Sequence, residues 1–303
     1  MTDKPRIGLI GVGNMGAPMA RRLSAAGHEL MVYDLQRAAL DALLASDPSL
    51  LAAETLSQIG ESCRVAITML PDSAAVRQAV LGGEGQGGLA QAMAPGGVIV
   101  DMSSSAPTAT VALGAELREH GLDLVDAPVS GGVPRARDGS LTIMAGGAPD
   151  VVDAVAPILS AMGTVHRTGP LGSGHAMKAL NNYVSAAGLL AVSEALIIAR
   201  RFGLDPKIMN DILKVSTGRN NTTDNKVEQY LLNRAFDSGF ALDLLLKDVT
   251  TAQDLATELA LDAPWLKTCR ALLDQAAQAL DPGADHTAAF AFLERRLTRP
   301  NQD

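Results

Sequence analysis

The stretch that most constrains the fold is Gly11-Val12-Gly13-Asn14-Met15-Gly16, close to the start of the 303-residue chain. Residues 6–10 before it are mostly apolar and predict a short strand, and the pattern over residues 17–26 after it predicts a helix. A second predicted strand, residues 28–33, ends at Asp34. Glycines spaced in this way between a strand and a helix, with a second strand and an acidic residue beyond, predict a dinucleotide-binding loop.

Each glycine of this loop has its own physical task in such a site. Gly11 makes the tight turn, Gly13 lets the backbone approach a pyrophosphate, and Gly16 lets the helix pack closely on the strand. The N-terminus of the helix adds backbone N–H groups and a positive dipole end, both of which favour phosphate. We therefore assign the whole loop to the cofactor.

Asp34 bears on which dinucleotide the loop binds. A carboxylate at the end of the second strand accepts hydrogen bonds from the adenosine ribose hydroxyls and repels a 2′-phosphate, which favours NAD over NADP. Arg37 could instead pair with a 2′-phosphate, or could be a solvated residue at the start of a helix, and we prefer the second role. The predicted cofactor is NAD, with NADP as the alternative.

Strands and helices continue to alternate over the first half of the chain. Further strands are predicted at residues 64–70, 97–101, 122–127 and 140–145, and helices at residues 74–81 and 108–120. This alternation predicts a doubly wound parallel sheet with right-handed crossovers, the Rossmann architecture of the α/β class. In such sheets ligands bind beyond the carboxyl ends of the strands.

Three loops are expected at those strand ends. They are Leu70-Pro71-Asp72, Ser103-Ser104-Ser105 and Pro128-Val129-Ser130-Gly131-Gly132. The last offers a hydroxyl group and successive backbone N–H groups without a bulky side chain, an arrangement that can hold a carboxylate. The alternative is an ordinary turn after a strand, and the loop by itself does not distinguish the two.

The second half of the chain carries helical patterns only. After an amphipathic segment at residues 149–162 and a strand-like piece at 165–168, helices are predicted at residues 176–202, 206–215, 226–233, 242–259, 264–279 and 287–297. This change predicts a Rossmann domain over residues 1–165 and an all-helical domain over residues 166–303. The long helix at residues 176–202 would join them.

That long helix begins at a second informative stretch, Gly172-Ser173-Gly174-His175-Ala176-Met177-Lys178-Ala179-Leu180-Asn181-Asn182. Lys178 and Asn182 are four residues apart, so a helix presents both on one face. An ammonium and a carboxamide placed together could hold and protonate a small oxygenated substrate. The alternative is a solvated lysine with a helix-favouring neighbour.

Composition excludes several functional classes. A net charge of −8 without any basic run argues against nucleic acid as a partner. The two cysteines and five histidines match no metal-ligand spacing, so we expect no metal site. The first predicted strand follows Met1 too closely for a signal peptide, and no uninterrupted apolar run reaches the ~20 residues that span a bilayer. We therefore expect a soluble cytoplasmic protein with no membrane partner.

Taken together, the motifs resemble the β-hydroxyacid dehydrogenases, a family that includes 3-hydroxyisobutyrate dehydrogenase and tartronate semialdehyde reductase. The resemblance covers nearly the whole chain and rests on five motifs in order. They are residues 8–16, Met69-Leu70-Pro71, residues 126–132, residues 172–182, and Phe240 with Lys247-Asp248. It implies NAD-dependent hydride transfer to or from a small carboxylate-bearing substrate, and a homodimer or homotetramer with contacts in the helical domain.

The resemblance also implies roles for single residues. Lys178 matches the catalytic lysine of the family and Asn182 an asparagine that helps to hold the substrate. The substrate carboxylate would bind at Ser130, Gly131 and Gly132. The cofactor would contact Leu70 and Pro71, Ser104 where the family often has a threonine near the nicotinamide, and Lys247, which would lie near the cofactor and the substrate.

One departure concerns the substrate. Where the family often has a further glycine after Gly132, this chain has Val133-Pro134-Arg135, and Arg135 and Arg137 could either reach a second anionic group or be solvated. The function predicted from the residues and the resemblance together is that of a 3-hydroxyisobutyrate dehydrogenase-like enzyme. The alternatives are a tartronate semialdehyde reductase, an imine reductase on the same scaffold, which the presence of Lys178 disfavours, and a non-catalytic dinucleotide-binding protein.

Overall fold

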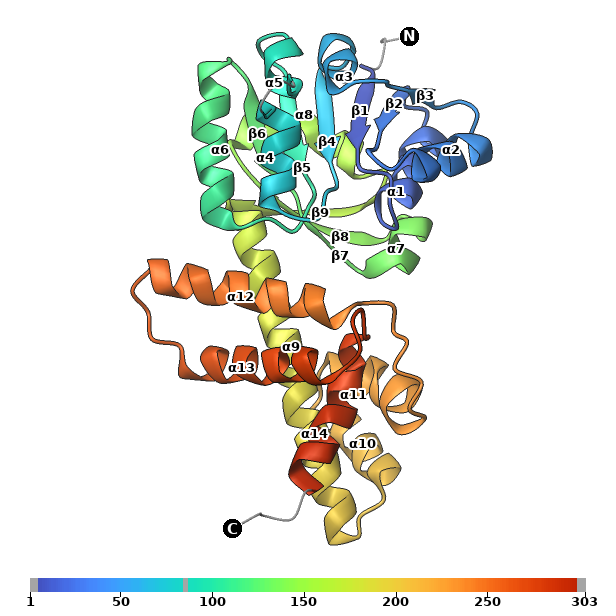
Figure 1. Cartoon of the computed structure of the whole chain (residues 1–303), viewed down its shortest axis with the longest axis vertical. Helices are drawn as coiled ribbons and strands as arrows, with labels where there is room; N and C mark the ends of the chain where they lie inside the picture. The colour runs from blue at the N-terminus through green and yellow to red at the C-terminus, as the bar shows by residue number, and fades with distance from the viewer. Residues whose placement is uncertain (1–4, 84–86, 299–303) are drawn as a thin grey trace. The chain divides into compact units, whose positions relative to one another are not determined.

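The computed structural model describes residues 5–83 and 87–298. The contacts within the chain divide it into two units, Met1–Lys178 and Ala179–Asp303 (Figure 1). The predicted boundary at residue 165 falls inside strand β9 (Gly163–Gly169), which still pairs with β8 (Leu141–Gly146) of the first unit. Helix α9 (Ser173–Phe202) carries the chain from the first unit into the second.

A nine-stranded sheet forms the centre of the first unit. Six strands run parallel in the order β3 (Leu51–Ala52), β2 (Leu30–Tyr33), β1 (Ile7–Ile10), β4 (Val65–Thr68), β5 (Val98–Asp101) and β6 (Asp123–Asp126). The chain moves outward from β1 first to one side and then to the other, so the direction of winding changes between β1 and β4. This arrangement confirms the predicted Rossmann architecture, and it places a topological switch point at the carboxyl end of β1.

The far edge of the sheet differs from the all-parallel prediction. Strand β8 runs antiparallel to β6 and to the short strand β7 (Val129–Ser130), while β9 runs parallel to β8. Only helix α7 (Gly132–Asp138) lies between β7 and β8. A parallel crossover needs a dozen or more residues, so this short connection can only return the chain in the antiparallel direction.

Helices cover both faces of the sheet. One face is covered by α1 (Gly16–Ala25), α2 (Arg37–Ser46), α7 and α8 (Pro149–Leu159), and the other by α3 (Leu56–Ser62), α4 (Ser73–Leu81), α5 (Leu89–Ala92) and α6 (Pro107–Glu119). Alternate residues of each strand therefore enter different cores: Ile7 and Leu9 of β1 face α1 and α8, whereas Ile10 faces the other layer. Strands buried on both faces explain the nearly continuous apolar runs in the sequence.

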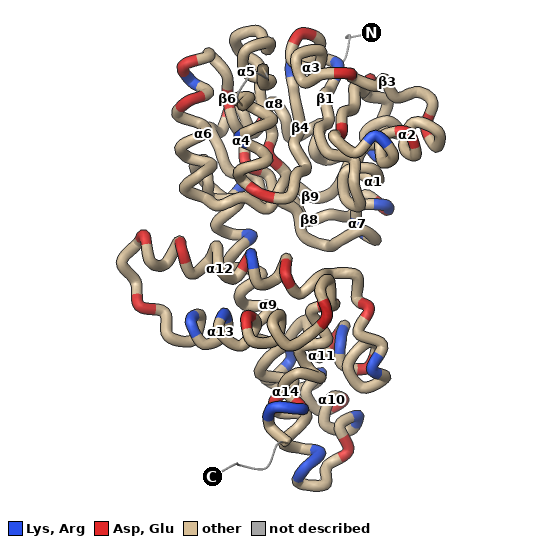
Figure 2. Tube along the Cα trace, in the orientation of Figure 1, with Lys and Arg blue, Asp and Glu red and all other residues tan. Residues whose placement is uncertain are grey.

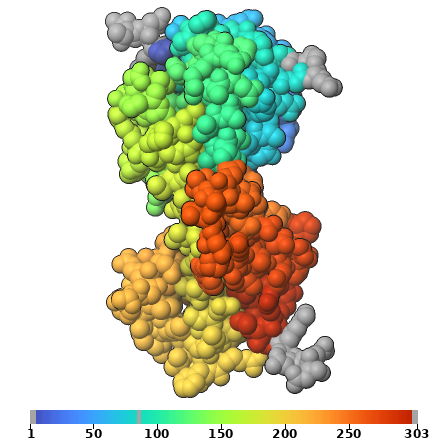
Figure 3. Space-filling view, turned by 90° about the vertical axis from the view of Figure 1, so that its left-hand side faces the viewer, coloured from blue at the N-terminus to red at the C-terminus, as the bar shows by residue number. Residues whose placement is uncertain are grey.

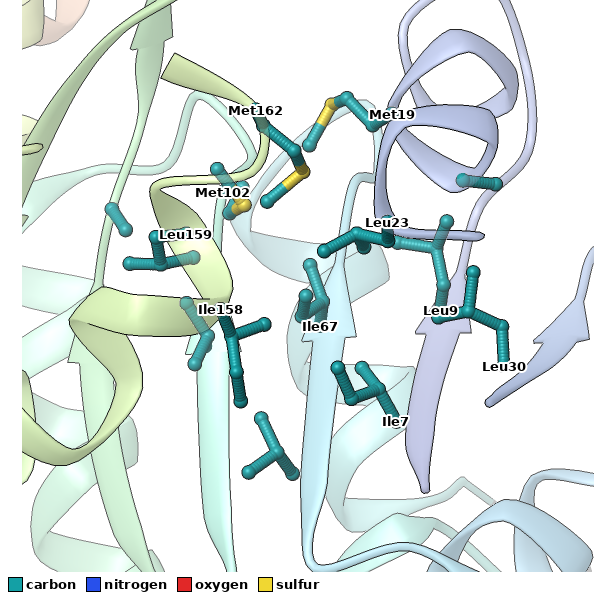
Figure 4. Close-up of a cluster of buried hydrophobic side chains, with 14 of the residues drawn as sticks. Ile7, Leu9, Met19, Leu23, Leu30, Ile67, Met102, Ile158, Leu159 and Met162 are labelled. Carbon is teal, nitrogen blue, oxygen red and sulfur yellow. The ribbon is translucent and has the colours of Figure 1, made fainter. Parts of the chain in front are cut away.

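Figure 4 shows the core on the first of these faces. Met19 and Leu23 of α1 and Ile158 of α8 are directed at the strands that carry Leu9 and Ile67. All but Ile158 of these side chains are completely buried. Burying one such side chain stabilises the fold by about 1.5–3 kcal/mol, so this aliphatic layer holds β1 and α1, and the loop between them, in place.

Over its described residues, 179–298, the second unit contains helices and no strand of the sheet, as predicted. Besides most of α9 it contains α10 (Pro206–Lys214), α11 (Asn221–Asn225), the π-helical turn η1 (Val227–Leu232), α12 (Leu242–Glu258), α13 (Pro264–Ala279), the 3₁₀ turn η2 (His286–Ala288) and α14 (Ala289–Thr298). Residues of α9, η1, α12, α13 and α14 form one hydrophobic core. Acidic and basic residues are interspersed along both units (Figure 2).

Helix α9 is the one described helix that is long and apolar enough to cross a bilayer by length and composition. Half of its most apolar window is buried within the protein, and Leu189, Leu190 and Leu196 belong to the core of the second unit. Helix α9 is therefore part of the hydrophobic core of the second unit. The helix begins three residues earlier than predicted, so Ser173 and Gly174 lie within its first turn.

Candidate active site

The glycine loop between β1 and α1 has three glycines for three different physical reasons. Gly11 has a φ of +92°, which disfavours any side chain. A methyl group at Gly16 would lie 1.9 Å from the carbonyl oxygen of Gly11, so only glycine lets α1 start this close to the strand. Beside Gly13 there is nothing within 4 Å of the position that a methyl group would take. The backbone there faces open space, as a phosphate-binding loop requires.

The N-terminus of α1 is suited to hold an anion. Met15 is its N-cap and makes no side-chain capping hydrogen bond, and its first turn contains no acidic residue. The backbone N–H groups of a first helical turn need partners from outside the helix. With open space at Gly13, this uncapped helix end fits the pyrophosphate of a dinucleotide.

We expect alanine at Gly16 to destabilise the fold, and alanine at Gly13 to weaken NADH binding without destabilising the fold. Gly16→Ala places a methyl group against backbone, which should lower the free energy of unfolding by ~3 kcal/mol or more and abolish coenzyme binding with it. Gly13→Ala meets no protein atom, so the melting temperature should stay within a few degrees of wild type while the Kd for NADH rises by about tenfold. Thermal melts and fluorescence titrations with NADH measure both, and unchanged NADH binding in Gly13→Ala would contradict the assignment of the loop.

Asp34 lies beside the glycine loop at the end of β2. Its Oδ2 accepts a hydrogen bond from the Val12 N–H at 2.7 Å, and its Oδ1 accepts one from the Gln36 N–H at 2.7 Å. These bonds fix the carboxylate next to the loop, and each oxygen retains a second lone pair for a ribose hydroxyl. Arg37 is engaged elsewhere, with Asp41 at 2.9 Å and Glu54 at 3.6 Å, in agreement with its preferred role as a surface residue.

The loops after β4 and β5 are tied together by a carboxylate that the sequence-based site does not contain. Asp101 ends β5; its Oδ1 accepts hydrogen bonds from the Thr68 hydroxyl at 2.9 Å and the Ser103 N–H at 3.0 Å, and its Oδ2 accepts one from the Ser105 hydroxyl at 2.7 Å. The Ser103 hydroxyl oxygen in turn accepts from the Leu70 N–H at 2.9 Å. In the sequence the only indication of this role is that Asp101 ends an apolar strand shortly before three serines. The two loops that carry Leu70, Pro71 and Ser104 therefore form one hydrogen-bonded structure.

The loop predicted to hold the substrate carboxylate combines a strand end and a helix start. Ser130 ends β7 and is partly buried, and Gly131 and Gly132 have φ values of +127° and +66°, which favour glycine at both positions. The side chain of Arg135 folds back over this loop, because a methyl group at Gly131 would lie 2.5 Å from the Arg135 Cδ. Successive backbone N–H groups without a bulky side chain of their own can hold an anion.

Asn182 belongs to a second group of polar residues, in the helical unit. Its Nδ2 donates to the Asp248 Oδ2 at 2.5 Å, and its Oδ1 accepts from the Asn181 Nδ2 at 3.1 Å. Asp248 is itself buried, and the Lys247 Nζ lies 3.9 Å from its Oδ1. Asp248 therefore fixes the orientation of the Asn182 amide. The sequence analysis did not place Asp248 in the site, although it directly follows Lys247.

The predicted site residues thus fall into two groups. In the first unit the glycine loop, Asp34, Leu70, Ser104 and Ser130 follow the carboxyl ends of strands β1, β2, β4, β5 and β7, and Lys178 is the last residue of the unit. In the second unit Asn182, Lys247 and Asp248 lie together. Helix α9 carries Lys178 and Asn182 one turn apart. Across the two described segments, 5–83 and 87–298, no three His, Cys, Asp or Glu side chains are arranged to hold a metal ion.

A switch point in a parallel sheet, an open glycine loop and an uncapped helix end together define a dinucleotide-binding protein. The family models agree. Residues 6–172 match the NAD binding domain of 6-phosphogluconate dehydrogenase, and residues 172–293 match the NAD-binding model of NADP-dependent 3-hydroxyisobutyrate dehydrogenase.

Characterised relatives identify the family. The chain is 35% identical to the 2-hydroxy-3-oxopropionate reductase of Escherichia coli over 290 residues, 95% of this chain and 97% of that protein. It is 35% identical to the 2-(hydroxymethyl)glutarate dehydrogenase of Eubacterium barkeri over 259 residues, 85% of this chain and 84% of that protein. The solved structure of Mycobacterium tuberculosis 3-hydroxyisobutyrate dehydrogenase with L-serine matches with a TM-score of 0.86 at 28% identity, covering 96% and 99% of the two chains. The chain belongs to the β-hydroxyacid dehydrogenase family.

Proposed function

We propose that this enzyme catalyses reversible, NAD-dependent oxidation of a small β-hydroxy acid of the 3-hydroxyisobutyrate type to its semialdehyde. The observation that carries the proposal is the α9 pair, Lys178 and Asn182, with the Asn182 amide oriented by the buried carboxylate of Asp248. A protein that only bound a dinucleotide would have no use for this fixed amide one helical turn from a lysine.

Each group has a role in the proposed reaction. When bound, the nicotinamide supplies or accepts the hydride. Ser130, Gly131 and Gly132 bind the substrate carboxylate and hold the carbinol carbon in place. Lys178 takes the hydroxyl proton during oxidation and returns it during reduction, and Asn182 orients the hydroxyl group.

The proposal assigns NAD as the preferred coenzyme. Asp34 presents a carboxylate where a 2′-phosphate would lie, and Arg37, the nearby cation, is already paired with Asp41 and Glu54. We further assign dinucleotide binding to the domain predicted over residues 1–165, which also supplies the carboxylate-binding loop, and oligomer contacts and the substrate-binding Asn182 and Lys247 to residues 166–303.

Arg135 supports a second candidate for the substrate, a hydroxy acid with two carboxylates. The aliphatic stem of its exposed side chain lies against Gly131, so the chain carries a cation within one side-chain length of the loop proposed for the first carboxylate. The name of the Eubacterium barkeri relative describes a diacid of this kind.

An initial-rate screen tests the function. Purified enzyme is assayed with NAD and with NADP against a panel of 3-hydroxy monoacids and hydroxy diacids, in parallel with Arg135→Ala. Preference for a branched monoacid, unaffected by Arg135→Ala, supports the first candidate, and preference for a diacid that Arg135→Ala removes supports the second. Absence of turnover with every acid would refute both.

The helical unit is proposed to form a homodimer or homotetramer. Apolar residues at the end of α9 and along α10 are exposed, Phe202 by 83%, and the others are Ile198, Leu204, Ile208, Ile212 and Val215. The α10 segment lies on the surface in Figure 3, and exposed patches of this kind are typical of protein interfaces. Light scattering should give a multiple of 31.4 kDa, and Ile208→Glu with Ile212→Glu should reduce it to one chain.

We also propose a cytoplasmic location. Cys63 and Cys269, the two cysteines of the chain, are both free and buried. Unpaired thiols are typical of reducing compartments. Fractionation of the native host with an antibody against the chain tests this assignment.

A further inference from the structure

Four buried polar residues lie in or next to the first turn of α9, directly before Lys178. They are Asp101, Thr110, Asp126 and His175, each exposed by 3% or less. All four belong to the first unit, and none of them is among the residues assigned to substrate or coenzyme. Buried carboxylates and imidazoles are costly unless they are paired, so their presence here requires an explanation.

Asp126 holds the start of the helix. Its Oδ1 accepts from the Gly172 N–H and its Oδ2 from the His175 N–H, both at 2.8 Å. Burial raises the pKa of Asp126, while the His175 ring and these two N–H groups oppose the rise. A methyl group at Gly174 would lie 2.2 Å from the Met144 carbonyl oxygen, so the first turn is also pressed directly against β8. The helix start therefore has very little freedom to move.

The His175 ring connects this turn to two strands and to α6. Its Nδ1 lies 2.8 Å from the Thr110 Oγ1, which lies 3.1 Å from the Ala106 carbonyl oxygen. Thr110 has one proton and donates it to that carbonyl, so its oxygen accepts from the His175 Nδ1–H. The Nε2 then faces the Asp101 Oδ2 at 3.7 Å and has no hydrogen-bond partner among the described residues. A proton on Nε2 would be directed at the Asp101 carboxylate.

Asp101 is also the carboxylate that ties together the loops after β4 and β5. Through it the Leu70 loop, the Ser103–Ser105 loop and the first turn of α9 meet at one buried point. A side chain at this point controls both the loops assigned to the coenzyme and the helix that carries the assigned proton donor.

We propose that His175 is a positioning residue: with Asp101 and Asp126 it sets the first turn of α9, and so the Lys178 amine, relative to the loops after β4 and β5. This inference rests on the proposed function. Lys178 follows His175 by three residues, less than one helical turn, so a shift of that turn moves the amine with it. A misplacement of about 1 Å at a reacting group can lower a rate by roughly 10²-fold.

The kinetic test compares His175→Leu, which keeps the volume and removes both ring nitrogens, with His175→Asn, which keeps a donor near the Nδ1 position. The matched control is His166→Leu, at an exposed position on β9. In His175→Leu we expect kcat per NADH-binding site to fall by about 10–100-fold, with the KM for the hydroxy acid changed by no more than about threefold. His175→Asn should recover most of the lost kcat. The His166→Leu control should have the wild-type kcat. A structural role alone would reduce the amount of NADH-binding protein and leave kcat per site unchanged. A kcat for His175→Leu within about threefold of wild type therefore overturns the proposal.

Hydrogen–deuterium exchange gives a readout that does not depend on turnover. In His175→Leu we expect faster exchange in peptides that cover residues 170–178 and residues 68–72, and unchanged exchange in β1 and α8. If the wild type oxidises no hydroxy acid, the proposed function fails and the exchange result alone decides. Faster exchange in both segments then supports the coupling of helix and loop through His175, and unchanged exchange overturns it.

Discussion

Replacing Lys178 with methionine is expected to lower kcat by about 10²–10⁴-fold, the range typical of a lost general acid–base group. Methionine keeps the length and apolar stem of lysine, so the partly buried position on α9 should stay filled. The Kd for NADH should change by less than about twofold, because the glycine loop and Asp34, which are assigned to the coenzyme, are untouched. Stopped-flow reduction of the semialdehyde and a fluorescence titration with NADH measure the two quantities separately.

The matched control for this variant is Lys207→Met. Lys207 lies on the surface of α10, where it pairs with Asp211 at 3.3 Å, an exposed ion pair of little energetic value. Its replacement should leave kcat unchanged. A Lys178→Met enzyme with at least a tenth of the wild-type kcat would show that Lys178 is not the proton carrier, and equal losses of kcat and NADH binding would point to damage of the fold.

The part of the site that the sequence predicts best is the part that is local in the chain. The glycine loop, its flanking strand and helix, and Asp34 lie within 29 residues, 6–34. Gly11 and Gly16 have steric reasons that a strand–turn–helix pattern already implies. The pair of Lys178 and Asn182 on α9 is local in the same sense, because two residues four positions apart on a helix lie on the same face. Such features need no knowledge of tertiary contacts.

The residues that the sequence analysis missed depend on contacts between distant segments. Leu70 and Ser103 are 33 residues apart, Asp126 and His175 are 49 apart, and Asn182 and Asp248 are 66 apart. In the sequence the missed residues Asp126, His175 and Asp248 are each a single polar residue near an apolar run, with nothing to distinguish them from surface residues. Only the sheet order and the packing of α9 and α12 reveal which of them are buried and paired.

The antiparallel edge of the sheet was missed for a related reason. The residues of β8 are mostly apolar and predict a strand, but a strand pattern contains no information on direction. Direction follows from the length of the connection, and α7 lies in a stretch for which the sequence analysis predicted no helix. The direction of β8 matters for the site, because Ser130 of β7 is held in place by its antiparallel pairing with Thr142 of β8.

The helical unit contains a second buried polar cluster, in which Lys226 is the titratable group of interest. The His286 Nδ1 lies 3.0 Å from the Phe240 carbonyl oxygen and so carries the proton, which leaves Nε2 to accept from the Lys226 Nζ at 2.8 Å. Burial lowers the pKa of Lys226 to about 8, although the nearby Asp285 opposes this shift. Asp285 also accepts hydrogen bonds from the Gly239 and Phe240 N–H groups, so the cluster fixes the chain just before α12.

The lowered pKa of Lys226 should appear as a dependence of stability on pH. Between about pH 8 and 10.5 the unfolded chain keeps the Lys226 proton and the folded chain has lost it, so the unfolded state binds more protons and this group's contribution to the free energy of unfolding increases with pH. The increase is at most ~3 kcal/mol. Cys63 and Cys269, whose pKa burial raises to about 11, act with the opposite sign above about pH 9, so the informative quantity is the difference between wild type and Lys226→Met.

Urea unfolding at several pH values measures that difference. Lys226→Met removes a partly buried ammonium. The free energy of unfolding of wild type minus that of the variant should therefore be smallest near pH 7 and should increase steadily up to about pH 10.5. Lys267→Met is the control, because Lys267 is exposed and pairs with Asp262 on the surface, and its difference from wild type should be the same at each pH. A Lys226→Met difference equally independent of pH would mean that Lys226 keeps an ordinary pKa, and that its contact with His286 is made by an ammonium with access to water.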